Sequence, residues 1–370
     1  MTRLRILALE PYLARSHEQF LDGLASHSRH RLECATLPAR KWKWRMRTSA
    51  IHYARLLEER SEPVDLFFAS DYVNLGELRS LLPSRFRDVP VVLYFHENQL
   101  TYPLQEGEFL DYQYAMIHLY GMLAADRVVF NSDYHRRELL DALRDLVRLV
   151  PDLDLRPDLD AIEARSSVLP IGLDLPRPDR GAVGDPPVIV WNHRWEYDKN
   201  PAGFLEALAG LESQKRPFRL RLLGQRFRTL PTEFREILDR WPNAVIESEY
   251  PESYEEYVAA LRQGDIAIST AIHEFFGVGT LEALRCGLHP VLPNDLAYPE
   301  LLPEEFRGFG LYPRERGPVD ALAAAIDRVR RPSWLAQREA LQRSTDRFEW
   351  PQLAPRYDTL FEEVASAGRA

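Results

Sequence analysis

The chain has only two cysteines, Cys34 and Cys286, among its 370 residues. Both fall in segments that we expect to be core strand or helix, so we expect buried small side chains rather than a disulfide or a metal pair. Such sparse usage is typical of a reducing compartment. Long apolar runs are missing as well, because no stretch approaches the ~20 residues needed to cross a bilayer.

Positive charge is also scarce. The chain has 47 lysines and arginines against 56 acids, which gives a formal net charge of -9. This balance excludes a protein that coats nucleic acid by overall charge, so any such contact must come from a local patch. The segment from Met1 to Glu10 is basic and then apolar, but Glu10 and Pro11 interrupt it and it lacks a small-residue cleavage site. We expect a first strand there, and a cytoplasmic protein.

What the sequence does contain is a repeated alternation of short apolar runs and helical patterns, which predicts parallel sheets in an α/β fold. A chain of this length suits two domains, each with its own core. In the first half the apolar runs lie at 5–9, 32–36, 65–69, 91–95, 127–130 and 167–169. In the second half they lie at 188–191, 219–223, 245–247, 266–269 and 289–292, and helical patterns follow at 334–344 and 353–365.

Prolines and glycines gather between the two halves, at 171–187. We therefore expect a Rossmann-like domain at 1–172, a linker at 173–187, a second Rossmann-like domain at 188–345 and a C-terminal helix at 346–370. The C-terminal helices are expected to pack back toward the first domain. Two such halves leave a cleft, which is a usual place for ligands. Because open α/β sheets bind ligands at the carboxyl ends of their strands, the residues that follow strands are the candidates for the site.

The stretch from His273 to Gly287 follows the strand at 266–269 and runs into a helix. A turn at Gly277 lets Glu274 fold back over the helix N-terminus, while Glu282 lies within the helix. Unpaired N–H groups and the helix dipole suit a phosphate or sugar hydroxyls there. Glu282 can accept hydrogen bonds from a ribose diol, and Glu274 can meet the sugar at the other end of a sugar nucleotide. The alternative is that both acids merely favour the helix dipole.

Two cations follow the first strand of the second half. Arg194 and Lys199 lie five residues apart across a turn. They can converge on a pyrophosphate, arginine through its planar fork and lysine as a point charge. The alternative is a pair of solvated loop cations, but the same sheet edge is expected to carry Glu274 and Glu282.

Polar side chains also follow the strands of the first half, where the opposite lip of the cleft is expected. They form three groups: His96-Glu97-Asn98-Gln99, Ser16-His17 and Asn131-Ser132. A lone histidine is more often structural than catalytic, and nothing in the local sequence shows otherwise for His96. Its place at the ligand-binding end of a strand nevertheless makes it a candidate.

One segment of this acidic chain is strongly basic. Residues 38–47 read Pro-Ala-Arg-Lys-Trp-Lys-Trp-Arg-Met-Arg, so five of the ten are cationic and two tryptophans are interleaved. Aromatic faces for bases and cations for phosphates suit single-stranded or looped nucleic acid. The equal alternative is the start of an amphipathic helix with its tryptophans in the core. The candidate RNA contacts are Arg40, Lys41, Trp42, Lys43, Trp44 and Arg45.

Glu274 and Glu282 resemble the Glu-x7-Glu signature of retaining glycosyltransferases of the GT-B architecture, in which two Rossmann-like domains face each other across a cleft. Taken together, the motifs resemble more narrowly the tRNA-queuosine alpha-mannosyltransferase family. The likeness spans nearly the whole chain and rests on the segments 37–45, 94–103, 129–132, 193–199 and 273–278. One departure precedes Ser16-His17, where family members commonly have a glycine-rich turn and this chain has Leu13-Ala14-Arg15. The backbone approach to the acceptor is expected to differ there.

This resemblance implies transfer of mannose from GDP-mannose to queuosine in a tRNA anticodon, that of tRNA-Asp in the family, with retention of configuration. It implies no obligatory metal or other cofactor. The catalytic residues are then His96, Glu274, Arg194 and Lys199. The donor-binding residues are Arg194, Lys199, Gly224, Glu274, Phe275, Phe276, Gly277, Val278 and Glu282. The acceptor-binding residues are Ser16, His17, Arg40, Lys41, Trp42, Lys43, Trp44, Arg45, His96, Glu97, Asn98, Gln99, Asn131 and Ser132.

Two other functions fit the same sequence. One is the same fold acting on another acceptor, such as a polysaccharide, a lipid or a small molecule, and the other is a non-catalytic RNA-binding module. The intact Arg194/Lys199 and Glu274/Glu282 pairs favour an enzyme, and the lack of an apolar membrane-facing stretch disfavours a lipid and a membrane partner. The expected partners are a nucleotide sugar and a queuosine-containing tRNA, and the sequence does not indicate the oligomeric state.

Overall fold

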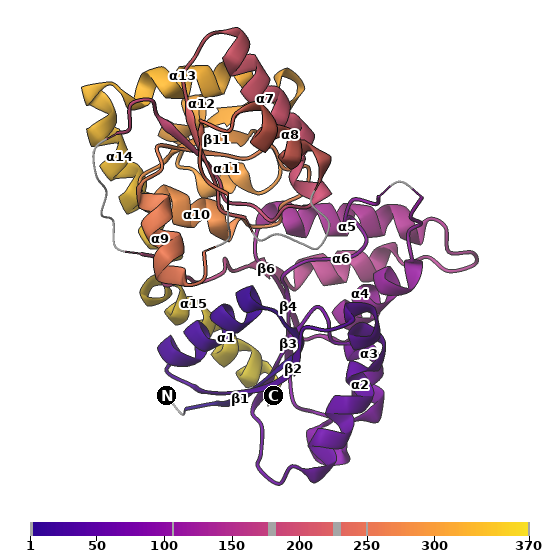
Figure 1. The fold of residues 1–370 in the computed structure, drawn as a ribbon. Coiled ribbons are helices and arrows are strands. Elements are labelled where there is room, and N and C mark those ends of the chain that lie inside the picture. The colour runs from indigo at the N-terminus through magenta and orange to yellow at the C-terminus, as the bar shows by residue number, and fades with distance from the viewer. Residues whose placement is uncertain (1–2, 106, 177–182, 225–230, 249–250, 369–370) are drawn as a thin grey trace. The chain divides into compact units, whose positions relative to one another are not determined.

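The computed structural model describes residues 3–105, 107–176, 183–224, 231–248 and 251–368 (Figure 1). The chain divides into two compact units. Unit 1 comprises Met1–Asp174 together with Phe348–Ala370, and unit 2 comprises Leu175–Arg347. Of the expected linker at 173–187, residues 177–182 lie outside the described residues. Among the described residues, no helix is both long and apolar enough to cross a membrane.

Unit 1 is built on a six-stranded parallel sheet in the order β2-β1-β3-β4-β5-β6. Each of the six apolar runs of the first half forms a strand, as the sequence predicted. Most of these strands are buried on both faces, which is why they are continuously apolar. The strands are β1 (Arg5–Leu13), β2 (Arg31–Pro38), β3 (Leu66–Ser70), β4 (Val91–Phe95), β5 (Arg127–Phe130) and β6 (Ser166–Val168).

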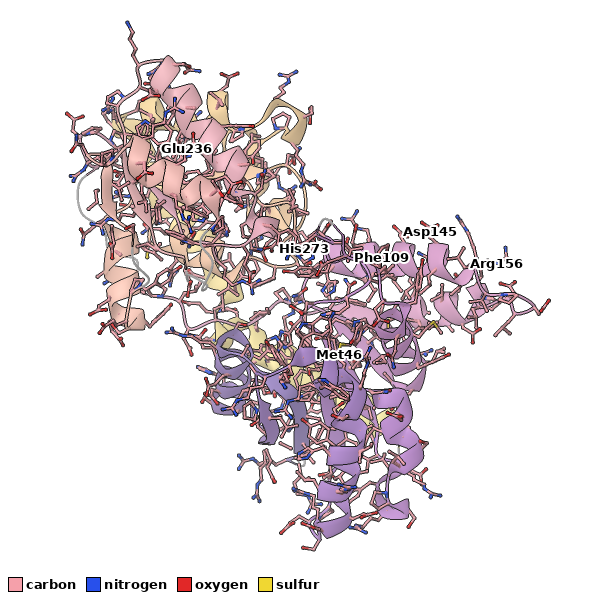
Figure 2. The ribbon with its side chains drawn as sticks, turned by 45° about the vertical axis from the view of Figure 1, so that its right-hand side comes forward. Met46, Phe109, Asp145, Arg156, Glu236 and His273 are labelled. Atoms are coloured by element: carbon pink, nitrogen blue, oxygen red, sulfur yellow. The ribbon has the colours of Figure 1, made fainter. Side chains whose placement is uncertain are left out.

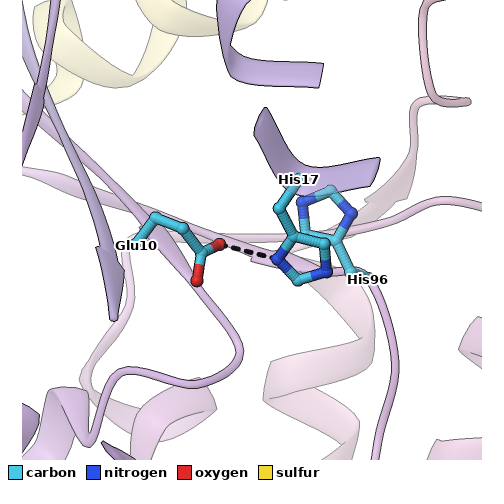
Figure 3. A group of neighbouring side chains, drawn as sticks. All are labelled: Glu10, His17 and His96. Atoms are coloured by element: carbon cyan, nitrogen blue, oxygen red, sulfur yellow. Dashed lines mark hydrogen bonds and ion pairs between the residues drawn. The ribbon is translucent and has the colours of Figure 1, made fainter. Parts of the chain in front are cut away.

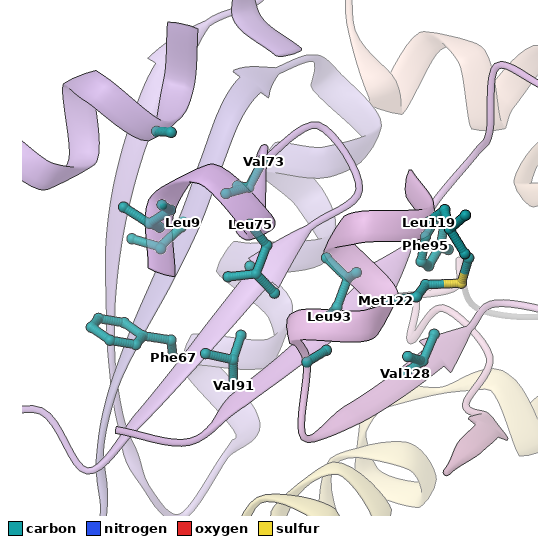
Figure 4. Packing of buried hydrophobic residues seen from close by; sticks show 14 of the residues in the cluster. Leu9, Phe67, Val73, Leu75, Val91, Leu93, Phe95, Leu119, Met122 and Val128 are labelled. Atoms are coloured by element: carbon teal, nitrogen blue, oxygen red, sulfur yellow. The ribbon is translucent and has the colours of Figure 1, made fainter. Parts of the chain in front are cut away.

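Helices cover both faces of this sheet (Figure 1). One face packs against α2 (Trp42–Glu59), α3 (Leu75–Leu81), α4 (Tyr112–Ala124), α5 (Asp133–Val147) and α6 (Arg156–Ala164), and a short 3-10 helix, η1 (Ser84–Phe86), follows α3. Alternate strand residues such as Leu9, Phe67 and Leu93 point into this core (Figure 4). Met46 of α2, labelled in Figure 2, is fully buried in a smaller cluster with Tyr72.

The opposite face of the same sheet is covered by α1 (Arg15–His27) and α15 (Trp350–Ala367). Phe20 of α1 stacks on Tyr94 of β4 with ring centroids 5.0 Å apart, and Trp350 is fully buried 5.6 Å from Phe20. The hydroxyl of Tyr357 donates to the carbonyl of Pro170 at 2.9 Å. The last helix therefore completes the core of unit 1, as the sequence predicted, whereas α14 (Pro332–Ser344) belongs to unit 2.

Unit 2 is built on a second six-stranded parallel sheet, in the order β12-β11-β10-β7-β8-β9. Its strands are β7 (Val188–Trp191), β8 (Arg219–Leu222), β9 (Val245–Glu247), β10 (Ile266–Ile268), β11 (His289–Pro293) and β12 (Leu311–Tyr312). The first five were predicted. The sequence did not reveal β12, because a two-residue strand shows no periodicity.

The helices of unit 2 also lie on both faces of their sheet (Figure 1). The face with α9 (Tyr254–Arg262) and α10 (Val278–Arg285) contains Cys286 in its core. On the other face Trp191 stacks on Phe204 of α7 at 4.5 Å. The remaining helices are α7 (Pro201–Ser213), α8 (Thr232–Arg240), α11 (Tyr298–Leu301), α12 (Glu304–Gly310), α13 (Val319–Val329) and α14 (Pro332–Ser344), with 3-10 helices η2 (Tyr197–Lys199), η3 (Arg314–Arg316) and η4 (Thr345–Phe348).

The two cysteines differ in environment. Cys286 is buried, whereas Cys34 is exposed, and both are free thiols. The expectation that Cys34 is buried was wrong, because β2 is the edge strand of its sheet and exposes part of its length.

Each sheet has one point where the strand order reverses. In unit 1 the chain forms β1 and β2 and then places β3 on the other side of β1. In unit 2 it forms β7, β8 and β9 and then places β10 on the other side of β7. In open α/β sheets, ligands bind at such switch points, outside the carboxyl ends of the strands. Each unit therefore has one preferred place for a site.

Candidate functional site

At the switch point of unit 2, a buried lysine joins two segments. Lys199 is 6% exposed, and its Nζ lies 3.0 Å from Asp198 Oδ2 and 3.4 Å from Glu274 Oε2. It also donates a hydrogen bond to the carbonyl of His273 at 2.9 Å. Burial lowers the pKa of Lys199, but the two carboxylates outweigh it and raise the pKa above its usual value. The lysine is therefore held as a cation beneath the loop that leads into α10.

Glu274 is the exposed partner in this ion pair, because a fifth of its side chain reaches solvent. Burial raises the pKa of Glu274, while Lys199 and then His193 and His273 lower it below its usual value. The pKa of the adjacent His193 is lowered as well. Burial, followed by the charge of Lys199, lowers its pKa to about 4, so its imidazole is neutral at pH 7.

Arg194 lies at the rim of this cluster. Half of its side chain is exposed, and it pairs with Glu196 at 3.2 Å. It is near enough to Lys199 for its charge to lower the pKa of that lysine. The structure therefore joins Lys199 to Glu274 and places Arg194 beside them. That Arg194 and Lys199 bind one diphosphate together stays a prediction.

The turn before α10 depends on Gly277, which has φ 99° and occupies the N-cap position. A residue with a side chain is strained in this left-handed conformation, and glycine also leaves the N–H groups of the first turn open. Phe275 and Phe276 are each 4% exposed, so their side chains anchor the loop in the core. Val278 is half-buried at the first position of the helix. In this part of the loop the backbone, rather than the buried phenyl rings, is available to contact a nucleotide sugar.

Glu282 is 9% exposed within α10, and the hydroxyl of Tyr257 on α9 is hydrogen-bonded to its carboxylate. Asn192, directly after β7, donates from Nδ2 to that hydroxyl at 2.9 Å and to the carbonyl of Gly279 at 2.7 Å. Burial, followed by the charge of Glu282, raises the pKa of Tyr257 well above its usual value, so the phenol keeps its proton. Tyr257 and Asn192 therefore orient the carboxylate that was predicted to bind a ribose.

Gly224 follows β8 and lies against the turn after β7. A Cβ on Gly224 would lie 1.6 Å from the carbonyl oxygen of His193. Only glycine permits this approach of the two strand ends. Gly224 is therefore required for packing. Its contact with a nucleotide sugar stays a prediction.

At the switch point of unit 1, the predicted residues His17 and His96 lie beside Glu10, which was not predicted (Figure 3). His17 of α1 donates from Nδ1 to Oε2 of Glu10 at 2.9 Å, and its ring stacks on that of His96 with centroids 4.1 Å apart. Burial lowers the pKa of His17, but Glu10 outweighs it and raises the pKa to about 9. Burial and the charge of His17 lower the pKa of His96 well below its usual value. A charged imidazole therefore lies under a neutral one.

Glu10, His17 and His96 each offer one possible metal-ligating atom, and these atoms lie within 4.8 Å of one another. The rings of His17 and His96 are stacked with an interplanar angle of 24°. Ring nitrogens bind a metal along the plane of the ring, so two stacked rings do not converge on one ion. One carboxylate oxygen of Glu10 is already used by His17. The arrangement fits an ion pair better than a metal centre.

Other predicted residues of unit 1 hold this edge in place. Asn131 donates from Nδ2 to the carbonyl of His96 at 2.8 Å, and Ser132 caps α5 by accepting a hydrogen bond from the N–H of His135. Asn98 is fully buried and accepts hydrogen bonds from the two backbone N–H groups of the turn that follows it. Ser16 is exposed in the first turn of α1. Asn98, Asn131 and Ser132 are thus structural in this form, and their contact with an acceptor stays a prediction.

The structure separates the members of the basic segment. Trp42 packs on Tyr114 with ring centroids 4.9 Å apart, whereas Trp44 is 62% exposed. Arg45 donates to the carbonyl of Pro38 at 3.2 Å. Arg40, Lys41 and Lys43 are exposed, and Lys43 lies over the ring of Trp42. Both alternatives therefore hold in part, because one tryptophan is packed and the other faces solvent.

Several residues of both edges were not among the predicted site residues. They are Glu10 and Asp71 in unit 1 and Asn192, Asp198 and Tyr257 in unit 2. Asp71 and Asn192 directly follow a strand, Asp198 lies in the segment after β7, and Glu10 is a charged residue in the second half of the apolar strand β1; these positions are the signal that could have found them. Tyr257 lies on a helix and carries no such signal.

Two Rossmann-like units, each a six-stranded parallel sheet with a polar site at its switch point, are typical of the GT-B fold. Solved structures agree in fold: a glycosyltransferase from Rickettsia africae has a TM-score of 0.66 at 12% identity and covers 98% of this chain and 99% of its own. Sucrose-phosphate synthase from Thermosynechococcus elongatus has a TM-score of 0.69 at 15% identity and covers 99% and 100%.

Sequence comparison narrows this class. The family model "tRNA-queuosine alpha-mannosyltransferase N-terminal" matches residues 5–173, and "Glycosyl transferases group 1" matches residues 176–343. A Drosophila melanogaster protein named tRNA-queuosine alpha-mannosyltransferase is 37% identical over 312 residues, which are 81% of this chain and 82% of that protein. The chain belongs to the tRNA-queuosine alpha-mannosyltransferase family. A GDP-mannose:cellobiosyl-diphosphopolyprenol alpha-mannosyltransferase of Xanthomonas oryzae pv. oryzae is 24% identical over 217 residues, 56% of this chain and 55% of that protein.

Proposed function

We propose that this enzyme transfers mannose from GDP-mannose to queuosine in a tRNA anticodon, that of tRNA-Asp in particular, with retention of configuration. The observation that carries the proposal is the cluster of Lys199, Glu274 and Glu282 around the Gly277 turn, in a chain whose relative in Drosophila melanogaster is named for this activity. The relative in Xanthomonas oryzae pv. oryzae is named for GDP-mannose, which supports that donor.

In the proposed reaction, the cations Arg194 and Lys199 offset the negative charge that develops on the departing diphosphate. Glu282 binds the ribose and Glu274 the mannose. The neutral imidazole of His96 suits the attacking hydroxyl, because an uncharged ring nitrogen can accept a hydrogen bond from it.

Retention fits attack on the face that the diphosphate leaves. A double displacement needs a carboxylate nucleophile beside the donor sugar, and Glu274, the carboxylate predicted to meet that sugar, is already bonded to Lys199. We also propose that no metal is required, because Lys199 and Arg194 supply the positive charge that a metal would bring. Activity that survives treatment with EDTA would support this point, and activity restored only by a divalent ion would contradict it.

On the acceptor side, the exposed Arg40, Lys41 and Lys43 suit phosphates, and Trp44 suits an unpaired base. A tRNA acceptor places the proposed reaction in the cytoplasm. The proposal is tested by incubating the protein with a panel of radiolabelled sugar nucleotides and tRNA from cells that can or cannot make queuosine. We expect label in tRNA only with GDP-mannose and queuosine-containing tRNA. Equal labelling of both tRNA preparations, or preference for another sugar nucleotide, would contradict it.

A further inference from the structure

Three carboxyl groups gather at the switch point of unit 1: Glu10 in the second half of β1, Asp71 directly after β3 and Glu97 two residues after β4. Glu10 and Asp71 are each 2% exposed, and Glu97 is half-buried. All three act on the charge of His17 and favour its protonated form. We call these three residues the acidic cluster. It contains three carboxyl groups and only one imidazolium, that of His17, so positive charge is scarce at this switch point.

Asp71 shows that this shortage is not met within the described part of the chain. Its Oδ1 accepts a hydrogen bond from the N–H of His96 at 2.9 Å, while its buried Oδ2 has no hydrogen-bond partner among the described residues. Burial, followed by the charge of Glu97, raises the pKa of Asp71 well above its usual value. Buried carboxyl groups of this kind are costly unless a cation or a donor compensates them.

Glu97 is the member that a ligand can reach. Its Oε1 accepts hydrogen bonds from the hydroxyl of Tyr72 and from Nε2 of Gln99, the latter at 2.9 Å. These contacts fix the direction of the carboxylate. Its second oxygen, Oε2, receives no hydrogen bond from the described residues. Tyr72 is itself held by stacking on Tyr12 with centroids 4.9 Å apart.

We propose that the acidic cluster binds an organic ammonium group on the acceptor, with Oε2 of Glu97 accepting its hydrogen bond. Glu10, which is paired with His17, and Asp71 do not touch the ligand. The stacked ring of His96 lies on the same edge and suits a hydroxyl close to the ammonium group (Figure 3). A metal cation is a poorer fit, because the two imidazole planes do not converge.

This inference rests on the proposed function and makes its acceptor site more specific. Queuosine carries a secondary amine next to a cyclopentene diol, and such an amine is protonated at neutral pH. Guanosine has no group of this kind. The acidic cluster would thus recognise the chemical feature that distinguishes the modified nucleoside from the base it replaces, which the basic segment, through its contacts with phosphates, cannot do.

The test measures competitive inhibition of the full-length enzyme by two probes, free queuosine and its N-acetyl derivative, in which the amine is neutral. We expect the wild type to bind queuosine more tightly, and Glu97→Gln to reduce the ratio of the two inhibition constants by about tenfold, the order expected when a charge-assisted hydrogen bond becomes a neutral one. The acetyl group adds the same bulk to the probe whether it binds the wild type or Glu97→Gln. Any steric penalty therefore cancels when the two ratios are compared. Glu62→Gln, an exposed carboxylate near the other edge of the sheet, is the matched control and should keep the wild-type ratio.

The outcomes separate this inference from the proposed function. If the wild type does not label queuosine-containing tRNA at all, the proposed function fails. If it labels that tRNA but binds both probes equally, or if Glu97→Gln keeps the wild-type ratio, the acceptor stands and the ammonium site is wrong. A Glu97→Gln protein that does not fold is replaced by Glu97→Asp, which keeps the charge but withdraws the oxygen and should raise both KM and the inhibition constant of queuosine while sparing the N-acetyl probe.

Discussion

Nζ of Lys199 lies 3.4 Å from Oε2 of Glu274, so the cation predicted to bind the donor diphosphate is bonded to the carboxylate predicted to bind the donor sugar. The two residues come from different segments at the switch point of unit 2, and Lys199 is buried together with Asp198, while Glu274 is partly exposed. They act as one electrostatic group, and the effects of changing them should not add.

Replacing Lys199 by methionine should destabilise unit 2. The change leaves the buried Asp198 and the partly exposed Glu274 without their shared cation, and breaking a buried ion pair such as Lys199–Asp198 costs roughly 3–5 kcal/mol. Urea unfolding at pH 7 measures this decrease in stability. Lys215→Met, at an exposed lysine, should change the free energy of unfolding by no more than about 0.5 kcal/mol. Equal stability of the two variants would show that the buried pair is not a structural element.

Arg194→Ala should lower turnover without lowering stability. Half of the Arg194 side chain is exposed, so its removal leaves no cavity, but removal of one group that stabilises developing charge typically costs ~10²–10³ in kcat. Steady-state kinetics with saturating donor measure this effect. Arg219→Ala, at an exposed arginine that begins β8, serves as the control. Near-normal turnover of a folded Arg194→Ala protein would reject its role at the diphosphate.

The Tyr257–Glu282 contact should determine how strongly the enzyme prefers a ribose. Calorimetry with GDP and 2′,3′-dideoxy-GDP measures that preference directly. Glu282→Gln should remove most of it, Tyr257→Phe should reduce it in part, and the double variant should resemble Glu282→Gln alone. Glu274→Gln should keep the preference for the ribose, because the proposed contact of Glu274 is with the sugar. A Tyr257→Phe protein with the full preference would show that the hydroxyl does not orient Glu282.

The basic segment should divide into an RNA contact and a structural part. Lys41→Ala with Lys43→Ala should weaken tRNA binding and flatten its log–log salt dependence by roughly 0.7 to 0.9 for each phosphate that is no longer neutralised. Trp44→Ala should weaken tRNA binding by ~1–3 kcal/mol without that change of slope. Filter binding at several salt concentrations measures both. Trp42→Ala is the contrasting variant, since removal of its packing on Tyr114 should lower the melting temperature.

If the Lys41→Ala, Lys43→Ala variant binds tRNA with the wild-type salt dependence, the contact with tRNA does not involve these two lysines. Donor binding provides a check on folding in each variant, because the predicted nucleotide site belongs to unit 2 and should be unaffected.

The ion pair of His17 should make stability depend on pH above neutrality. The pKa of His17 is about 9 in the folded protein against an ordinary value of 6.5, so the folded state binds more protons between these limits. The stabilisation is complete below pH 6.5 and is lost as the pH rises through 9, which amounts to about 3 kcal/mol at most. Urea unfolding from pH 6 to pH 10 measures it. In His17→Gln this part of the decline should be absent, and an unchanged pH profile would contradict the ion pair.

The sequence predicted the strands well because a buried parallel strand must be apolar along its whole length, as at Val91–Phe95. Side chains that follow such strands could be assigned to one edge for the same reason. His17 and His96 were found in this way, although their stacking depends on the place of α1, which the sequence does not determine.

Two features show where sequence reasoning stopped. Tyr257 precedes Glu282 by a strand and a loop, and only the packing of α9 beside α10 brings its hydroxyl to the carboxylate. Trp42 and Trp44 could have been separated from the sequence, because residues two apart on a helix point about 200° apart. That argument needs the helix to begin at Trp42, and the start of a helix is the part that a sequence defines least well.

The position of α15 reverses the order in which the two units are finished during synthesis. All strands and helices of unit 2 are continuous in the chain, whereas unit 1 includes a helix that begins at Trp350. A growing chain can therefore complete unit 2 while one face of the unit 1 sheet still lacks α15, which leaves Phe68 and Tyr94 without their final covering. The unit that leaves the ribosome first is the one whose core closes last.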